Sequence, residues 1–370
     1  MPALPLALQT WLAQFNLTVA QSLAMGVVPT PALARLGLQT ITQQFAMPSP
    51  SIDTVIDTLL LHTSVPCRIY HPEPQRALPV ILFFHGGGHM CGSSQVYDPI
   101  CQRIATTSQH IVVSVDYRLA PEHPYPLGLN DCMASLTALH DTLTAQPFAF
   151  LPSVTLMGDS AGGALATTLA QQSHLLNNVA QRGMTVEHLV LIYPSLDYTL
   201  SSPSITQLQQ GYLLESSKVL WYFDHYFQRG EDRQQASPLF RPLNANHPST
   251  MIITAGFDPL RDEGRRYADR LTQHHIACEH LHMEDMIHAY LNLDALAPDA
   301  CEHTYQAIAA YLAPKGHEIE PEAEQAQAQA QAMKAERDTE GKAEVKPQKG
   351  INKGAINRHV INKNGNKANV

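Results

Sequence analysis

The sequence predicts an α/β fold with a mostly parallel central sheet flanked by helices. Short apolar runs, such as residues 79–84 and 111–115, have the composition of strands that are buried on both faces. Between them lie segments of about 10–15 residues whose apolar positions recur at helical spacing. Strands that alternate with helices of this length are typical of β-α-β units, in which ligand chemistry gathers at the carboxyl ends of the strands.

Each element follows from its local pattern. Residues from about 4 to 45 have apolar positions at helical spacing, and Pro29 and Pro31 divide them into two helices. Residues 52–61 and 65–70 alternate polar and apolar positions, which predicts a pair of strands. Further helices are expected over residues 97–108, 127–143, 161–176, 261–274 and 301–312, and further strands over residues 154–157, 188–193, 251–255 and 279–283.

Two segments outside this alternation are candidates for a cap. The N-terminal helices, residues 1–46, are amphipathic and must pack on something, either as ordinary surface helices or as a cover for a substrate. Residues of about 200–235 form an aromatic-rich insertion between two strands and are the second candidate cap segment. Residues 47–314 are assigned to the catalytic domain. Residues 315–370 have few large apolar side chains and are predicted to be a disordered, low-complexity tail.

Composition and charge argue against several function classes. The net charge is −9, whereas a nucleic-acid-binding domain is expected to carry a basic face. The six cysteines are scattered without a C-x-x-C pair, which predicts reduced thiols in a cytoplasmic protein rather than a zinc site or a disulfide framework. The first residues lack the basic region of a signal peptide, and no run of about 18 uninterrupted apolar residues predicts a membrane span. We expect no metal and no cofactor.

The stretch 158–162, Gly-Asp-Ser-Ala-Gly, joins a predicted strand to a predicted helix. A serine at the tip of such a turn is exposed at the edge of the sheet, and only small neighbours allow the backbone to approach so closely. Ser160 is therefore the candidate nucleophile. A serine hydroxyl needs a base that takes its proton and a carboxylate that orients the base.

The partners of Ser160 are sought downstream, where a strand–turn nucleophile is followed first by the acid and then by the histidine. Asp258 comes just past a strand end and is the preferred acid, with Asp262 as the second choice. His288 follows a short strand and precedes the last helix, which makes it the preferred base. The competing histidines belong to a helix or its end, or to a strand: His274, His275, His280 and His282.

Donors for a developing oxyanion are expected from backbone amides. Gly86 and Gly87 lie in the loop after a buried strand and present amides without side chains, and Ala161 supplies the amide after the nucleophile. Either glycine-rich motif alone has moderate specificity, because each is also compatible with a flexible loop or a tight packing turn. Their order on the right elements makes the combination specific.

These motifs resemble those of the hormone-sensitive-lipase-like branch of the α/β-hydrolases, the bacterial family IV esterases. The resemblance covers about residues 52–312, and the matching stretches are His85–Gly88, Asp116–Pro126, Gly158–Gly163, Asp258–Gly264 and His288. It implies an α/β-hydrolase fold, a cap made of the N-terminal helices and the insertion, and ester hydrolysis through a serine acyl-enzyme. The sequence departs from the family pattern at His89 and Met157, which we expect to line or border the pocket.

We therefore predict a serine carboxylesterase for short- to medium-chain acyl esters, with the triad Ser160, His288 and Asp258 and an oxyanion hole of Gly86, Gly87 and Ala161. The same triad also suits amide, lactone or carbamate hydrolysis. A non-catalytic binding protein of the same fold is the alternative from another class. The expected partner is a small ester substrate, with no nucleic acid and no membrane span, and a homodimer is a further expectation from the resemblance.

Overall fold

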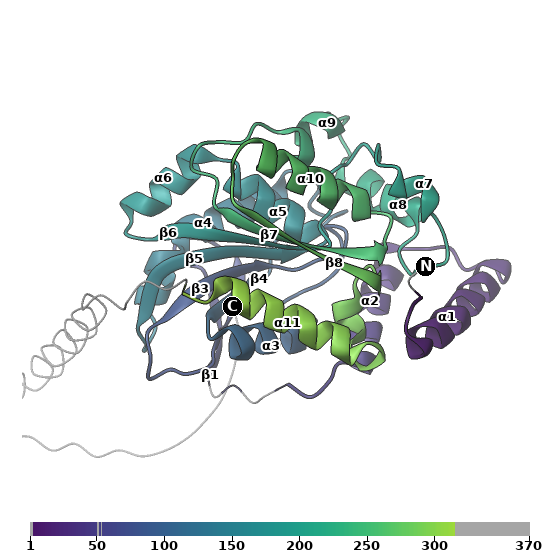
Figure 1. Cartoon of the computed structure of the whole chain (residues 1–370), viewed down its shortest axis with the longest axis horizontal. Helices are drawn as coiled ribbons and strands as arrows, with labels where there is room; N and C mark the ends of the chain where they lie inside the picture. The colour runs from purple at the N-terminus through teal and green to yellow at the C-terminus, as the bar shows by residue number, and fades with distance from the viewer. Residues whose placement is uncertain (1–2, 50–51, 53, 315–370) are drawn as a thin grey trace, which may run out of the picture. The chain divides into compact units, whose positions relative to one another are not determined.

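The computed structural model describes residues 3–49, 52 and 54–314 (Figure 1). The predicted tail, residues 315–370, lies outside the described residues. The sheet has eight strands in the order β1-β2-β4-β3-β5-β6-β7-β8. Strands β3 to β8 run parallel to one another, and β1 and β2 pair antiparallel at one edge. The predicted fold class, a mostly parallel sheet flanked by helices, is confirmed.

The central strands contain the apolar runs of the sequence, and β1 and β2 correspond to the two alternating segments. Their bounds are β1 Thr54–Leu59, β2 Pro66–His71, β3 Leu78–Phe84, β4 Ile111–Val115, β5 Phe150–Asp159, β6 Thr185–Ile192, β7 Ser249–Phe257 and β8 Cys278–Ile287. The side chains of β4 are all buried, as expected for a central strand covered on both faces.

Helices cover both faces of the sheet (Figure 1). One face packs against α4 Leu127–Thr144, α5 Ala161–Ala170, α6 Ser173–Gln181 and α10 Arg261–Gln273. The other face packs against α3 Asp98–Ser108 and α11 Pro298–Leu312. Each layer buries its own apolar cluster. Because β3 to β8 run parallel, their carboxyl ends lie at one common edge of the sheet.

The remaining elements lie outside these two layers. The N-terminal segment forms α1 Leu6–Ala24 and α2 Pro31–Phe45, divided as predicted. Leu8, Leu12 and Phe45 pack with Ile287, the last residue of β8, and with Leu293, which follows it. The insertion after β6 contains α7 Ser204–Gln207, α8 Ser216–Tyr226, α9 Arg233–Ala236 and the 3-10 turn Pro238–Phe240; a second 3-10 segment, Tyr290–Leu296, precedes α11. Among the described residues, no helix has both the length and the apolar character needed to cross a bilayer.

Three of the boundaries differ most from the sequence prediction. The helix expected over residues 161–176 is broken between α5 and α6, where the Gln171 side chain donates to the carbonyl of Pro238 (2.9 Å) and to the hydroxyl of Tyr267 (3.2 Å). Strand β5 begins at Phe150, and β8 continues to Ile287, because both find strand partners beyond their apolar runs. The extension of β8 matters for the site, since it determines where His288 emerges.

Candidate active site

Ser160 occupies a strained turn between β5 and α5. Its backbone dihedral angles are φ 50° and ψ −117°, a conformation that residues other than glycine rarely adopt. The turn tolerates no side chain at its two glycines: a Cβ on Gly158 would lie 2.4 Å from Gly162, and a Cβ on Gly162 would lie 1.8 Å from the carbonyl oxygen of Phe84. These close approaches explain the Gly-x-Ser-x-Gly spacing and press the Ser160 turn against the end of β3.

The structure brings the predicted acid, base and nucleophile together. The Nε2 atom of His288 lies 2.9 Å from the hydroxyl oxygen of Ser160, and Nδ1 lies 2.8 Å from Oδ2 of Asp258. Asp258 is fully buried, and its other oxygen accepts the N–H of Leu260 at 2.8 Å. The three side chains follow the ends of β5, β7 and β8, and the parallel sheet places the carboxyl ends of these strands at the same edge.

The competing acid and histidines lie elsewhere. Asp262 accepts the N–H of Ser204 (3.0 Å) and belongs to the polar network of the insertion. His280 and His282 project from β8 and both contact the hydroxyl of Thr254 at 2.9 Å. None of these side chains is hydrogen-bonded to Ser160 or His288 within the described residues.

The amide of Gly86 is not free to bind an oxyanion, which corrects the prediction for this residue. Its N–H donates to Oδ1 of Asp159 at 2.6 Å, and a Cβ at Gly86 would lie 2.5 Å from the same carboxylate. Gly87 and Gly88, by contrast, are half-buried and line the cavity together with Ser160 and Ala161. The N–H groups of Gly87, Gly88 and Ala161 donate to no atom of the described residues.

Asp159 is a residue that the sequence reasoning missed. Its carboxylate is buried between the N–H of Gly86 and the hydroxyl of Tyr97 (3.0 Å). Burial raises the pKa of the Asp159 carboxyl to about 7, although both hydrogen bonds and the charge of His288 act in the opposite direction. Asp159 thus connects the loop Gly86–Gly88, called the glycine loop below, to the turn that contains Ser160. The available signal was its place between Gly158 and Ser160, where a buried acid requires partners.

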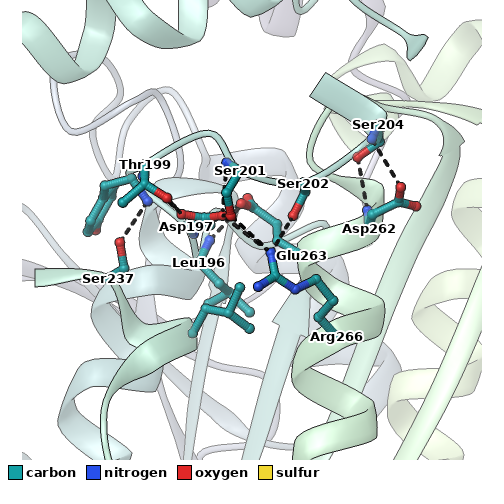
Figure 2. A network of polar contacts seen from close by, with 12 residues as sticks. Leu196, Asp197, Thr199, Ser201, Ser202, Ser204, Ser237, Asp262, Glu263 and Arg266 are labelled. Atoms are coloured by element: carbon teal, nitrogen blue, oxygen red, sulfur yellow. Dashed lines mark hydrogen bonds and ion pairs between the residues drawn. The ribbon is translucent and has the colours of Figure 1, made fainter. Parts of the chain in front are cut away.

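The segment after β6 is held to α10 by a second polar network (Figure 2). The buried carboxylate of Glu263 accepts the N–H groups of Leu196 (3.1 Å) and Asp197 (3.0 Å), and Arg266 donates to Ser202 (3.0 Å). Burial and the neighbouring charge of Asp197 raise the pKa of Glu263 well above its ordinary value. The network fixes the backbone next to Ser195, whose N–H donates to the carbonyl of Ser160 at 3.0 Å.

A cavity with about 1050 Å³ of empty space, part of it open to solvent, lies over Ser160. Its lining includes Phe15 of α1, Leu38 of α2, and Val219 and Tyr222 of α8. His89 and Met157 do not line it, contrary to expectation. His89 is buried, stacks on Tyr226 with a ring separation of 3.9 Å, and has its pKa lowered to about 3 by burial. Met157 is a core residue of β5.

The described residues contain no group of three or more His, Cys, Asp or Glu side chains arranged to hold a metal ion. The cavity presents a hydroxyl in contact with an imidazole, a buried carboxylate behind the imidazole, and free N–H donors beside the hydroxyl. This set is suited to acyl transfer.

Comparisons with known proteins agree with this chemistry. A family model described as the α/β-hydrolase fold matches residues 81–292, and the carboxylesterase family model matches residues 33–125. The chain is 34% identical to the carboxylic ester hydrolase LipN of Mycobacterium tuberculosis over 278 residues, which cover 72% of this chain and 73% of LipN. It is 37% identical to the carboxylesterase NlhH of the same organism over 256 residues, covering 67% and 78%.

A solved structure supports the same relationship. An ester-hydrolase from the metagenome of Lake Arreo, in complex with a bipyridine phosphonate derivative, superposes with a TM-score of 0.72 at 28% sequence identity. The match covers 84% of this chain and 98% of that chain.

Proposed function

This chain belongs to the α/β-hydrolase family, in its hormone-sensitive-lipase-like branch, and is a carboxylic ester hydrolase; we propose that it works through the triad Ser160, His288 and Asp258. The observation that carries the proposal is the continuous chain of contacts from the Ser160 hydroxyl through His288 to Asp258, at 2.9 and 2.8 Å.

In the proposed first step, the Ser160 oxygen attacks the ester carbonyl while Nε2 of His288 takes the hydroxyl proton. Asp258 accepts a hydrogen bond from Nδ1 and stabilises the imidazolium that forms. The same proton then passes from His288 to the leaving alcohol, and the acyl group stays on Ser160. In the second step His288 removes a proton from water, and the water oxygen attacks the acyl carbon. The bond between Ser160 and the acyl carbon then breaks, His288 returns its proton to the Ser160 oxygen, and the acid leaves.

For the oxyanion we propose the N–H groups of Gly87, Gly88 and Ala161. What supports this choice is that these three amides border the cavity beside Ser160 and have no other acceptor among the described residues. Gly86 does not bind the oxyanion in this proposal; its hydrogen bond to Asp159 holds the loop, and with it the amides of Gly87 and Gly88, in position. Preformed donors of this kind are worth about 3 kcal/mol each in related chemistry.

The segment 1–46 and residues of about 200–235 are proposed as the cap. Both contribute side chains to the cavity that contains Ser160, including Phe15 and Leu38 from the first and Val219 from the second. The mostly apolar lining is suited to the acyl chain of an ester, and we propose a preference for short- to medium-chain acyl groups. The cytoplasmic location and the homodimer stay predictions, and no observation favours amide, lactone or carbamate substrates over esters.

The test compares wild-type protein with Ser160→Ala on p-nitrophenyl butyrate. We expect Ser160→Ala to lose activity by about four orders of magnitude or more, because the acyl-enzyme cannot form. Ser153→Ala, which removes a hydroxyl from the same strand at a site that contacts Glu187, is the matched control and should keep full activity. A fluorophosphonate probe should label the wild type and the control only. Full turnover by Ser160→Ala would show the assignment to be wrong.

A second series measures p-nitrophenyl esters of increasing acyl length. We expect kcat/KM to peak at short to medium chains and to fall for long ones. A maximum at long chains would contradict the proposed chain-length preference but leave the triad untouched.

A further inference from the structure

The cavity over Ser160 contains a cation without a counter-ion. Lys218, in the first turn of α8, is half-buried and lines the cavity. The carboxylate of the lining belongs to Asp159, which already accepts hydrogen bonds from Gly86 and Tyr97. The imidazole of the lining belongs to His288, which already contacts Ser160 and Asp258. Lys218 forms no ion pair with a carboxylate of the described residues.

The surroundings of Lys218 do not replace such a partner. The ring of Tyr222 lies 5.9 Å from the ammonium group, and the thiol of Cys91 and the carboxylate of Glu215 act on the pKa of Lys218 only through their charges. The Glu215 carboxylate accepts the N–H of Gly211 at 3.3 Å instead. Burial lowers the pKa of Lys218, which means that the charged form is partly desolvated.

A partly desolvated ammonium group costs free energy unless something in the cavity offsets the cost. The neighbouring wall is apolar: Val219 and Leu214 line the same cavity beside Lys218. An apolar side chain at this position would avoid this electrostatic cost. The position of the charge therefore points to a ligand rather than to the stability of the fold.

Two further polar atoms of the same lining lack partners. The hydroxyl of Ser195, on a residue 4% exposed, and the Oδ1 atom of Asn292, on a residue 2% exposed, are buried and hydrogen-bonded to nothing in the described residues. Buried polar atoms are nearly always hydrogen-bonded in the working state of a protein. An apolar ester would leave the Ser195 hydroxyl and Lys218 unpaired, and both of these groups can donate to a carboxylate, whereas the Oδ1 atom of Asn292 only accepts and needs a separate donor.

We propose that the ester taken by this site carries a carboxylate of its own, distinct from the ester group that is cleaved, and that Lys218 pairs with it. The substrate class is then the monoesters of dicarboxylic acids or the esters of hydroxycarboxylic acids. This inference rests on the proposed function, because it assumes that Ser160 cleaves an ester in this cavity.

The experiment uses two pairs of esters in which a carboxylate replaces a terminal methyl group. Monomethyl adipate is compared with methyl hexanoate, which tests a carboxylate on the acyl side. Likewise, 6-acetoxyhexanoate is compared with hexyl acetate, which tests the alcohol side. For each pair the ratio of kcat/KM, anionic over neutral, is measured in the wild type, in Lys218→Met and in Lys218→Arg.

We expect the ratio for one pair to fall about ten- to a hundredfold in Lys218→Met, as for a lost charged hydrogen bond, and to be largely kept in Lys218→Arg. Arg229→Met is the matched control, because it removes one positive charge from an exposed position of the same insertion that does not line the cavity. Its ratios should equal those of the wild type. Lys218→Gln replaces Lys218→Met if the latter does not fold.

Ratios that are the same in the wild type and in Lys218→Met for both pairs would overturn the inference while leaving ester hydrolysis intact. A wild type that cleaves none of the four esters, nor p-nitrophenyl butyrate, would instead overturn the proposed function. In that case the binding of adipate, relative to hexanoate, is measured by calorimetry in the wild type and in Lys218→Met. Equal binding preferences in the two proteins would then overturn the inference as well.

Discussion

Replacing Arg35 with methionine should loosen the N-terminal helices from the catalytic domain. The Arg35 guanidinium, on α2, donates to the carbonyl of Met90 (2.9 Å) and to the carbonyl of Ala120 (2.8 Å), and it pairs with both oxygens of Glu122. Met90 follows the glycine loop, so a single side chain connects α2 to the backbone next to the proposed oxyanion hole.

The magnitude depends on which of these contacts dominates. The Glu122 side chain is 54% exposed, and an ion pair this exposed contributes about 0.5 kcal/mol. The two hydrogen bonds to carbonyls are part-buried and contribute about 1 kcal/mol each. Arg35→Met should therefore lower the free energy of unfolding by about 2–3 kcal/mol, whereas Glu122→Gln should cost only about 0.5 kcal/mol.

Function should respond in the same order. Leu33, Ala34 and Leu38 of α2 line the cavity, so a loosened α2 weakens substrate binding more than it changes the reacting groups. We expect KM for p-nitrophenyl butyrate to rise several-fold in Arg35→Met, with a smaller change in kcat. In Glu122→Gln both parameters should stay close to those of the wild type.

The assay is thermal unfolding together with steady-state kinetics for the two variants. For a domain of this size, about 1 kcal/mol corresponds to a shift in Tm of roughly 2 °C, so Arg35→Met should melt about 4–6 °C lower. Equal shifts in the two variants would mean that the ion pair carries the contact. An unchanged Tm and KM in Arg35→Met would refute the reasoning altogether.

Three further predictions concern the site itself. Because the pKa of Asp159 is raised to about 7, protonated Asp159 stabilises the folded state fully below about pH 4, and this contribution is lost as the pH rises to 7. Between these pH values the free energy of unfolding of the wild type, measured in urea, should fall by up to about 4 kcal/mol relative to that of Asp159→Asn. The same pH dependence in both proteins would contradict the burial argument. Glu263→Gln leaves one of two backbone N–H groups without an acceptor and should lower the free energy of unfolding by about 1–3 kcal/mol, which an unchanged urea midpoint would exclude. Gly88→Ala places a Cβ 2.5 Å from the ring of Tyr222 and should reduce kcat strongly. The control Gly26→Ala is also at positive φ but has nothing within 4 Å, so it should keep its activity and cost only about 1 kcal/mol of stability. Equal kcat values in the two variants would show that the loop at Gly88 can move to accept the added Cβ.

Much of the fold could be predicted because the local pattern of apolar and polar residues indicates most of its strands and helices. The run 79–84 is apolar throughout, and it forms the central strand β3. The order of Ser160, Asp258 and His288, each just past a strand, was sufficient to nominate them, because parallel strands end at one edge. The end of α5 was missed, since Gln171 leaves the helical pattern only through contacts with Pro238 and Tyr267.

The sequence by itself determined the strands, the helices, the strained serine turn and the identity of the candidate nucleophile, acid and base. Only the tertiary structure decided which glycine amides are free, because Gly86 is taken by a carboxylate that lies 73 residues away along the chain. It also decided that Lys218 faces the cavity and that Arg35 joins α2 to the glycine loop. Periodicity records whether a side chain is buried, but not which distant atom it meets, since that pairing arises only when the layers pack.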